Sequence, residues 1–368
     1  MHHIKYILIM VFAAMISCKE SYEIPGAAAR TNTLVVEGVI NSDGITTVKL
    51  SRSAALPDTS SILAETEAQV SVESESGTTT VLREQLPGSY ENPTITDPLQ
   101  KYRLHIRTSE GREYASDFVP VVIGPPIDSI SWSKKDGNVI VYANTHDVTN
   151  STRYYRWSYK ETWEFHSSFI SYWEYVNHTM IYRINNNIFT CYKDLESTSI
   201  LHASSARLVN DIISLAPLTT ISNGSEKISQ LYSIMVYQYP LTKDGYEYWE
   251  QLKKNTEKIG TIFDPQPSAN KTNIHCLSDP SEIVIGYISA SNINSKRLFI
   301  YNQEVLPWNY GTGCTETLVP KDSLDYYFTN FYIPTRQGNN PSDFFGSVPP
   351  CVDCTLAGTN VKPGFWPR

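Results

Sequence analysis

The feature that most constrains this chain is an alternation of apolar and polar residues that is repeatedly interrupted by turn residues. Over residues 32–124 the apolar positions recur at every second residue, as in Val70 and Val72. This period is typical of strands with one buried face, because successive side chains point to opposite faces of a sheet. The interruptions fall at Asp43-Gly44, Gly77, Pro87-Gly88 and Glu110-Gly111. About seven short strands with turns every 8–12 residues predict an immunoglobulin-like β-sandwich over residues 32–124.

A second region begins after Gly124-Pro125-Pro126, which we interpret as the domain boundary because Gly and Pro interrupt regular structure. Residues 127–368 are again rich in strand-forming residues and predict a larger antiparallel β domain. After Tyr301 the chain is rich in Gly, Pro, Asn and Asp, which predicts a Cys-rich C-terminal tail with little regular structure. The 24 tyrosines and the low charged fraction of 18% agree with a mainly β fold.

One amphipathic helix is predicted in this second region, over residues 242–259. Thr242 suits the N-cap, and Gly260 suits a left-handed helix end. Apolar side chains from Tyr246 to Ile259 fall on one stripe, and charged side chains fall on the other side. Such a helix in a strand-rich chain most simply covers the edge of a sheet or plugs the end of a barrel.

The aromatic side chains between residues 154 and 182 are the candidate ligand or partner surface of the chain. The residues that we single out are Tyr155, Trp157, Tyr159, Trp163 and Trp173. Large aromatics on a strand indicate either a surface for a peptide, glycan or protein, or a strand held between two layers. Core packing is the default explanation, since large apolar side chains are usually buried. Both interpretations stay open at the level of sequence.

The first 17 residues have the order of a secretory signal: Lys5, then an apolar run over residues 7–16, then a small residue. The apolar run is too short to span a bilayer as a helix. Because Cys18 follows at once, the segment resembles a bacterial lipoprotein signal, in which the cysteine is acylated and becomes the first mature residue. The resemblance implies a lipid anchor at Cys18 on the membrane and a tether over residues 18–31. An ordinary signal peptide with a chance cysteine is the alternative.

Six cysteines are present, and five remain if Cys18 is acylated. An odd number in an oxidising compartment allows at most two disulfides and leaves one thiol. We expect one disulfide to join Cys314 to either Cys351 or Cys354. A zinc site at the last two cysteines would need a second pair of ligands at similar spacing, and the sequence has none. No metal and no cofactor is therefore predicted.

Familiar catalytic motifs are missing from the sequence. It has no His-Glu-x-x-His, no Gly-x-Ser-x-Gly, no phosphate-binding loop and no calcium loop. The formal net charge of -8 argues against nucleic acid as a partner, because phosphate binding needs clustered Lys and Arg. We therefore expect a binding or structural protein and not an enzyme.

Several short segments together carry a resemblance to a known family. They are Leu34-Val35-Val36-Glu37-Gly38, Ile127-Asp128-Ser129-Ile130, Leu241-Thr242, Tyr248-Trp249, Phe263-Asp264-Pro265-Gln266-Pro267, Asn273-Ile274-His275-Cys276, Ile285-Gly286-Tyr287, Cys351 and Lys362-Pro363. The chain resembles an uncharacterised family of Bacteroidetes-type outer-membrane lipoproteins, which is defined by a domain of unknown function and typically encoded beside TonB-dependent receptors. The resemblance implies a lipid-anchored accessory or binding protein at the cell surface that partners a TonB-dependent transporter in nutrient capture. A structural or adhesive surface lipoprotein without a transporter partner is the alternative.

Overall fold

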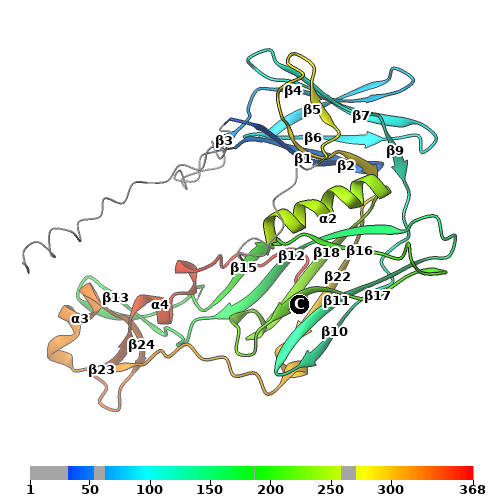
Figure 1. Ribbon diagram of the computed structural model, residues 1–368. Helices are drawn as coiled ribbons and strands as arrows, with labels where there is room; N and C mark the ends of the chain where they lie inside the picture. Colours follow the sequence, from blue (N-terminus) through cyan, green and yellow to red (C-terminus); the bar gives the residue numbers. More distant parts are fainter. Residues whose placement is uncertain (1–31, 54–62, 186, 258–270, 368) are drawn as a thin grey trace, which may run out of the picture.

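The computed structural model describes residues 32–53, 63–185, 187–257 and 271–367, and Figure 1 shows its architecture. The protein is mainly β, with an N-terminal immunoglobulin-like sandwich followed by a larger antiparallel β domain. The expected signal peptide (1–17), Cys18 and the tether (18–31) lie outside the described residues. Within the described ranges, no helix is both long and apolar enough to cross a membrane.

The N-terminal sandwich is built from two groups of strands that are far apart in sequence. The first group is β1 (Leu34–Asn41), β2 (Asp43–Arg52), β3 (Leu63–Ala64), β4 (Gln69–Ser74), β5 (Thr79–Leu86), β6 (Ser89–Ile95), β7 (Lys101–Arg107), β8 (Glu113–Ser116) and β9 (Val119–Val122). The second group is β19 (Ile274–Cys276), β20 (Ile285–Gly286) and β21 (Ser289–Ser291). The strands pair in the order β19-β8-β7-β4-β5-β6-β2-β1-β21-β9, and β9 also pairs with β7. The sheet thus closes around one core, in which Leu34, Ile106 and Tyr114 are fully buried.

The late strands correct the predicted division of the chain. β1 pairs in parallel with β20 and β21, and β19 pairs with β8. The prediction that residues 127–368 form one continuous domain is therefore wrong for residues 274–291, which complete the sandwich. Strands of two or three residues show no alternation of their own. They form because distant strands offer unpaired backbone groups. Gly286 lets β20 approach β1 very closely, since a Cβ on residue 286 would lie 2.3 Å from the carbonyl oxygen of Val36.

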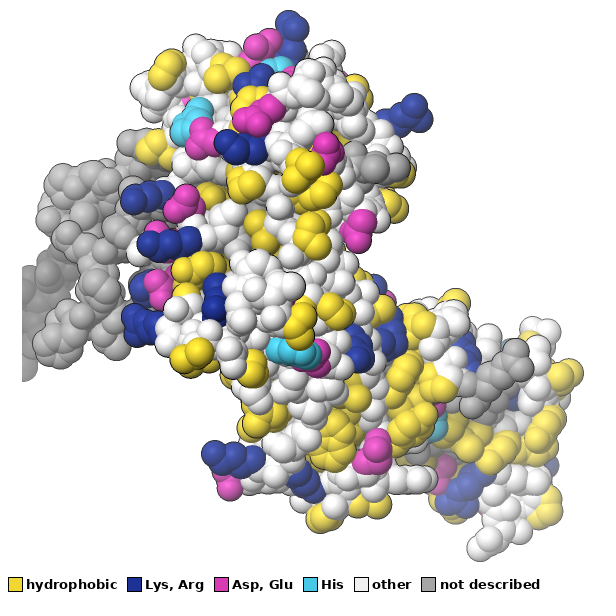
Figure 2. Space-filling model, turned by 90° about the vertical axis from the view of Figure 1, so that its right-hand side faces the viewer, with side chains coloured by type: hydrophobic (Ala, Val, Ile, Leu, Met, Phe, Trp, Pro, Cys, Tyr) yellow, Lys and Arg dark blue, Asp and Glu magenta, His cyan; other side chains and the backbone are white. Residues whose placement is uncertain are grey.

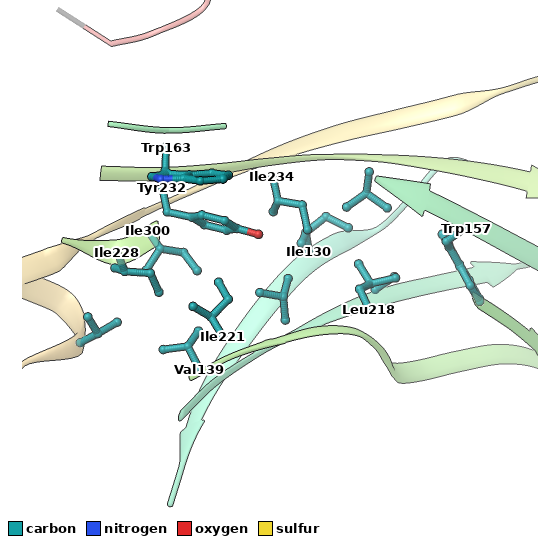
Figure 3. Packing of buried hydrophobic residues seen from close by; sticks show 14 of the residues in the cluster. Ile130, Val139, Trp157, Trp163, Leu218, Ile221, Ile228, Tyr232, Ile234 and Ile300 are labelled. Atoms are coloured by element: carbon teal, nitrogen blue, oxygen red, sulfur yellow. The ribbon is translucent and has the colours of Figure 1, made fainter. Parts of the chain in front are cut away.

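The larger domain is a second sandwich, made of two antiparallel sheets. One sheet has the order β10 (Ser129–Lys135), β11 (Asn138–Asp147), β17 (Asp211–Ile221). The other has the order β15 (Thr190–Glu196), β12 (Tyr154–His166), β18 (Leu231–Pro240), β22 (Asn294–Tyr301), with β16 (Leu201–Ser204) also paired to β12. The short 3-10 helices η1 (Glu226–Ile228) and η2 (Asn302–Val305) follow β17 and β22. The inner faces form one hydrophobic core, and Figure 3 shows Trp163, Tyr232 and Ile300 within it.

Helix α2 (Lys243–Glu257) is the amphipathic helix expected over residues 242–259, of which 258 and 259 lie outside the described residues. Thr242 caps its start as predicted, because Thr242 Oγ1 accepts a hydrogen bond from the backbone N–H of Gly245 at 3.1 Å. In Figure 1 the helix lies between the N-terminal sandwich and the second domain. Its buried Tyr248 stacks on Tyr287, with ring centroids 5.2 Å apart, so the helix contacts both domains.

The predicted boundary at Gly124 is an ordered junction where two chain segments cross between the domains. The backbone N–H of Gly124 donates to Asn292 Oδ1 at 2.8 Å, and Asn292 Nδ2 donates to the carbonyl oxygen of Gly124 at 3.0 Å. The side-chain amides of Asn294 and Gln238 both donate to the carbonyl oxygen of Pro125, at 2.9 Å. These bonds satisfy buried polar groups and order both crossing segments.

A small lobe, which we call the distal lobe, lies at the end of the molecule away from the N-terminal sandwich (Figure 1). It contains β13 (Trp173–Val176), β14 (Thr179–Tyr182), β23 (Thr317–Val319), η3 (Lys321–Ser323), α3 (Leu324–Asn330), β24 (Ile333–Gln337) and β25 (Phe344–Ser347). The short helices α4 (Pro349–Val352) and η4 (Cys354–Leu356) follow it. The prediction of little regular structure after Tyr301 is wrong here. The elements are short, and they are stabilised by a shared core of Val319, Phe328 and Phe344 instead of by a local sequence period.

Candidate interaction surface

The aromatic stretch of β12 does not form a surface. Tyr155, Trp157 and Trp163 are only 0%, 1% and 8% exposed, and Tyr159 is half-buried against the same core. β12 is a central strand, so side chains on its inner face pack against the opposite sheet β10-β11-β17. The hypothesis of a ligand- or partner-facing surface is therefore wrong for these four residues, which belong to the core.

The polar atoms of the buried aromatics find partners inside the core. Trp157 Nε1 donates to Gln238 Oε1 at 2.9 Å, and the Tyr155 hydroxyl donates to the carboxylate of Asp211. Burial raises the pKa of Tyr155, and the carboxylate of Asp211 raises it further. These bonds explain how large amphipathic side chains are accommodated in a closed interior.

Besides Asp211, the carboxylate of Glu161 is buried beside these aromatics. Glu161 is 1% exposed and accepts hydrogen bonds from the Tyr232 hydroxyl at 2.7 Å and from the Lys227 ammonium at 2.6 Å. Burial raises the pKa of Tyr232 well above its ordinary value, and the charge of Glu161 adds to this effect. A buried ion pair of this kind stabilises the core only while both partners are present.

Trp173 differs from the other four predicted residues because it lies in the distal lobe. It is half-buried, and its ring makes edge-to-face contacts with the rings of Phe344 and Tyr182, at centroid distances of 5.1 and 5.7 Å.

Exposed aromatic side chains gather around α3. Tyr326 is 61% exposed and Phe331 is 48% exposed, and their ring centroids are 5.3 Å apart. Tyr327 lies 5.3 Å from Tyr326 and stacks on Tyr332 at 5.4 Å. We call Tyr326, Tyr327, Phe331 and Tyr332 the α3 aromatic cluster. Exposed aromatic groups of this kind are typical of protein interfaces.

Contacts with the β13–β14 hairpin hold α3 in place. Asp325 Oδ1 accepts a hydrogen bond from the Tyr175 hydroxyl at 3.3 Å and pairs with His178 Nδ1 at 2.5 Å. The hydrogen bond to His178 holds the pKa of the Asp325 carboxyl below its ordinary value. On the buried side of α3, Phe328 packs so closely on Gly346 that a Cβ there would lie 2.5 Å from the ring. The α3 aromatic cluster is thus presented on an ordered support.

The β13–β14 hairpin adds exposed apolar side chains to the distal lobe. They are Tyr172, Val176, Ile181, Tyr182 and Ile184. Glu174 faces Ile181 across the hairpin, and Trp173 faces Tyr182, so the two faces of the hairpin alternate along each strand. One face packs on the core of the lobe, while Ile181 on the other face remains exposed.

Two disulfides surround the distal lobe. Cys314 is joined to Cys351, which is one of its two expected partners, and Cys191 in β15 is joined to Cys354. The first closes the segment that carries the late strands, and the second attaches that segment to the larger sheet. Cys276 is a buried free thiol. No three His, Cys, Asp or Glu side chains in the described part of the chain are grouped to hold a metal ion.

The sequence does contain one signal for the α3 aromatic cluster. Five of the seven residues over 326–332 are aromatic. A helix of seven residues is too short to display an amphipathic period, and the flanking Gly, Pro and Asn residues favour irregular structure. Local aromatic density would have identified the segment where periodicity did not.

Charges on the surface are mixed in sign. Figure 2 shows one face of the molecule, on which many Lys and Arg side chains lie beside Asp and Glu, with hydrophobic side chains between them. A partner that binds this face would meet apolar and polar groups together, without a large patch of a single charge.

Comparisons with known proteins identify a family. A family model described as a domain of unknown function (DUF4249) matches residues 19–297, so the distal-lobe strands β23–β25 lie beyond the matched range. The search of curated proteins returns no match. A segment of two fibronectin type-III domains from chicken tenascin is 12% identical, covers 57% of this chain and 92% of that chain, and has a TM-score of 0.18. The chicken interferon gamma receptor alpha chain is 11% identical, covers 58% of this chain and 91% of that chain, and has a TM-score of 0.14.

Proposed function

The chain belongs to the DUF4249 family, a domain of unknown function, and we propose that it is a lipid-anchored accessory protein of the cell surface that partners a TonB-dependent outer-membrane transporter in nutrient capture. The observation that carries this proposal is the α3 aromatic cluster, which exposes Tyr326 and Phe331 on an ordered lobe. Aromatic side chains of this type supply a large share of the binding energy in protein interfaces.

The placement of the distal lobe supports a role in docking. The chain enters the fold at β1 in the N-terminal sandwich, and the distal lobe lies at the opposite end (Figure 1). A lipid on Cys18 would therefore attach the sandwich end to the membrane through residues 18–31, which span at most about 50 Å when fully extended. The distal lobe would stay free to contact a transporter in the same membrane.

The disulfides agree with a location outside the cytoplasm. Cys314–Cys351 and Cys191–Cys354 both bound the distal lobe, and such bonds persist in oxidising compartments. They join the two ends of the late segment to each other and attach that segment to β15.

The test is a mild-detergent pull-down from native outer membranes, with a tag at the C-terminus and partners identified by mass spectrometry. The variant is Tyr326→Ser/Phe331→Ser. The matched control is Leu99→Ser/Val209→Ser, which changes two apolar residues that are 93% and 91% exposed elsewhere on the molecule. We expect wild type and control to recover a TonB-dependent receptor in near-stoichiometric amount, and the variant to recover at least about tenfold less.

Recovery of the lipoprotein alone, under conditions that keep other outer-membrane complexes intact, would contradict the proposal and favour the adhesive or structural alternative. Labelling with a palmitate analogue tests the anchor separately. We expect label on the wild type and none on Cys18→Ala, and an unlabelled wild type would remove the lipid anchor from the proposal.

A further inference from the structure

Strand β14 forms a free sheet edge in the distal lobe. Within the described part of the chain it pairs with β13 alone, in a two-stranded sheet. The backbone N–H of Arg183 donates to the carbonyl oxygen of Tyr172 at 2.9 Å, so these two residues are a hydrogen-bonded pair. Such pairs alternate with non-hydrogen-bonded ones in an antiparallel ladder, and Met180 and Tyr182 belong to the second kind. Their backbone N–H and C=O groups therefore point away from β13.

The β13–β14 hairpin holds this edge in a fixed conformation. Asn177 and His178 have φ angles of 48° and 59°, as in the type I′ turns that match the twist of a hairpin. The side chains of Trp173 and Tyr175 on β13 pack against the core of the distal lobe. The edge is thus ordered before a partner arrives, so little conformational entropy is lost when another strand pairs with it.

The features that usually protect an exposed edge are missing from β14. Proteins protect such edges with lysine, proline or a β-bulge, and β14 has none of these. The charged residue that follows the strand, Arg183, pairs with Glu174 at 2.8 Å, and its side chain is only 15% exposed. The edge strand β10 differs, because it ends in Lys134 and Lys135. The edge of β14 is therefore open to pairing with another strand.

Backbone geometry makes this edge complementary to a second copy of itself. When two antiparallel copies are centred on Ile181, Met180 of each lies opposite Tyr182 of the other, and all the outward N–H groups of these residues find acceptors. A register centred on Met180 would place Tyr182 opposite His178, which lies in the turn. A register centred on Tyr182 would place Met180 opposite Ile184, which lies beyond the strand. Each of these alternatives would lose about half of the hydrogen bonds.

Side chains also fit in the register that is centred on Ile181. The two copies of Ile181 face each other with Cα atoms about 4.5 Å apart, which brings their side chains into contact. Ile181 and Tyr182 are 44% and 62% exposed, so pairing would cover apolar surface that is now open to water. Thr179 lies opposite Arg183, and no two like charges face each other.

We propose that β14 is a dimerisation edge, at which a second copy of this chain pairs antiparallel with its own β14 about a two-fold axis at Ile181. The same surface patch is then used by both copies, as in the closed two-fold dimers that are commonest among protein oligomers. Because the strand has only four residues, the interface is small and the dimer is weak and reversible. The pairing uses no residue of the α3 aromatic cluster, and it needs neither the lipid anchor nor the transporter partner.

The first test is disulfide trapping in the full chain, with Cys18→Ala added so that no lipid is attached. Ile181→Cys places two thiols opposite each other at a distance that a disulfide spans. Thr179→Cys is the matched control, because residue 179 is exposed on the same face of β14 but would lie about 14 Å from its counterpart. We expect mild oxidation to form a covalent dimer of Ile181→Cys at least about tenfold faster than of Thr179→Cys. Equal rates, or no dimer in either variant, would overturn the inference.

The second test is sedimentation equilibrium of the Cys18→Ala protein between about 10 μM and about 1 mM, the range of weak interfaces. We expect a reversible monomer–dimer equilibrium. Ile181→Lys places two ammonium groups opposite each other and should raise the dissociation constant at least about fivefold. Val209→Lys adds the same charge at a residue that is 91% exposed outside β14, and it should change the constant less than about twofold. A protein that stays monomeric without either lysine, or a dimer that both lysines weaken equally, would refute the edge pairing.

Discussion

β12 and the α3 aromatic cluster contain the same types of side chain in opposite surroundings. β12 carries Tyr155 and Trp157 on its inner face, where the opposite sheet covers them. The α3 aromatic cluster carries Tyr326 and Phe331, which remain exposed. β12 is a central strand of its sheet, and the opposite sheet covers its inner face. The seven-residue helix α3 packs on a small three-stranded sheet with one side only and leaves its other side exposed. Position in the layers therefore decides whether an aromatic residue stabilises the fold or stays available to a partner.

The largest expected effect comes from Trp157. Trp157→Ala should lower the free energy of unfolding by about 3–5 kcal/mol, because it leaves a cavity and removes the donor to Gln238. Guanidinium chloride unfolding, followed by circular dichroism, measures the change. A loss below about 1 kcal/mol would show that β12 tolerates truncation as a surface strand does, and the comparison between the two regions would fail.

The two disulfides should differ in their effect on stability. Removing Cys191–Cys354 should cost more than removing Cys314–Cys351, because the cysteines are 163 residues apart in the first and 37 in the second. In the chain-entropy model each loss is of the order of 2–5 kcal/mol, and the difference between them is about 1 kcal/mol. Paired Cys→Ser variants, unfolded side by side in denaturant, measure both losses. The opposite ranking would indicate that native contacts of the distal lobe outweigh loop entropy.

The burial of Tyr248 makes the free energy of unfolding depend on pH in the alkaline range. Burial, with a further contribution from Glu37, raises the pKa of Tyr248 from 10.0 to about 12. Between these pH values the unfolded chain loses the phenol proton of Tyr248 while the folded chain keeps it. The contribution of this tyrosine to stability is therefore fully present below pH 10 and is lost as the pH rises toward 12. The fall due to Tyr248 should be about 2 kcal/mol in the free energy of unfolding.

Urea unfolding of wild type and Tyr248→Phe at several pH values between 9 and 12 measures this step. The free energy of unfolding should fall by about 2 kcal/mol less in the variant than in the wild type, since phenylalanine has no proton to lose. Parallel declines in the two proteins would show that Tyr248 does not titrate as a buried group.

The smallest expected effect concerns the exposed cluster. Tyr326→Ala should change the free energy of unfolding by no more than about 0.5 kcal/mol, because substitution of an exposed side chain leaves no cavity. The same denaturant assay used for Trp157→Ala measures it. Destabilisation of 2 kcal/mol or more would mean that Tyr326 supports the lobe, and its exposure could then no longer be taken as a sign of binding.

Some features were predictable from local sequence because their causes are local. Thr242 was recognised as an N-cap, since its side chain needs only the next few backbone N–H groups. The alternation of Val70 with polar neighbours predicted a strand with one buried face, and Val70 is fully buried. The residues of β19–β21 carried no such signal, because their strands exist only through pairing with β8 and β1.

The candidate surface was predicted in the wrong place for the same reason. Trp157 and Tyr326 both lie in aromatic-rich stretches of sequence, and only contacts between distant elements distinguish them.

By itself the sequence determined a mainly β fold, the capped helix α2 and the alternation that builds the N-terminal sandwich, because hydrophobic period and capping act over a few residues. Only the tertiary structure decided which strands complete that sandwich, which aromatic residues are core, and how Cys191 pairs with Cys354. These outcomes depend on contacts between residues separated by many tens of positions, and no local pattern encodes the partner in such a contact.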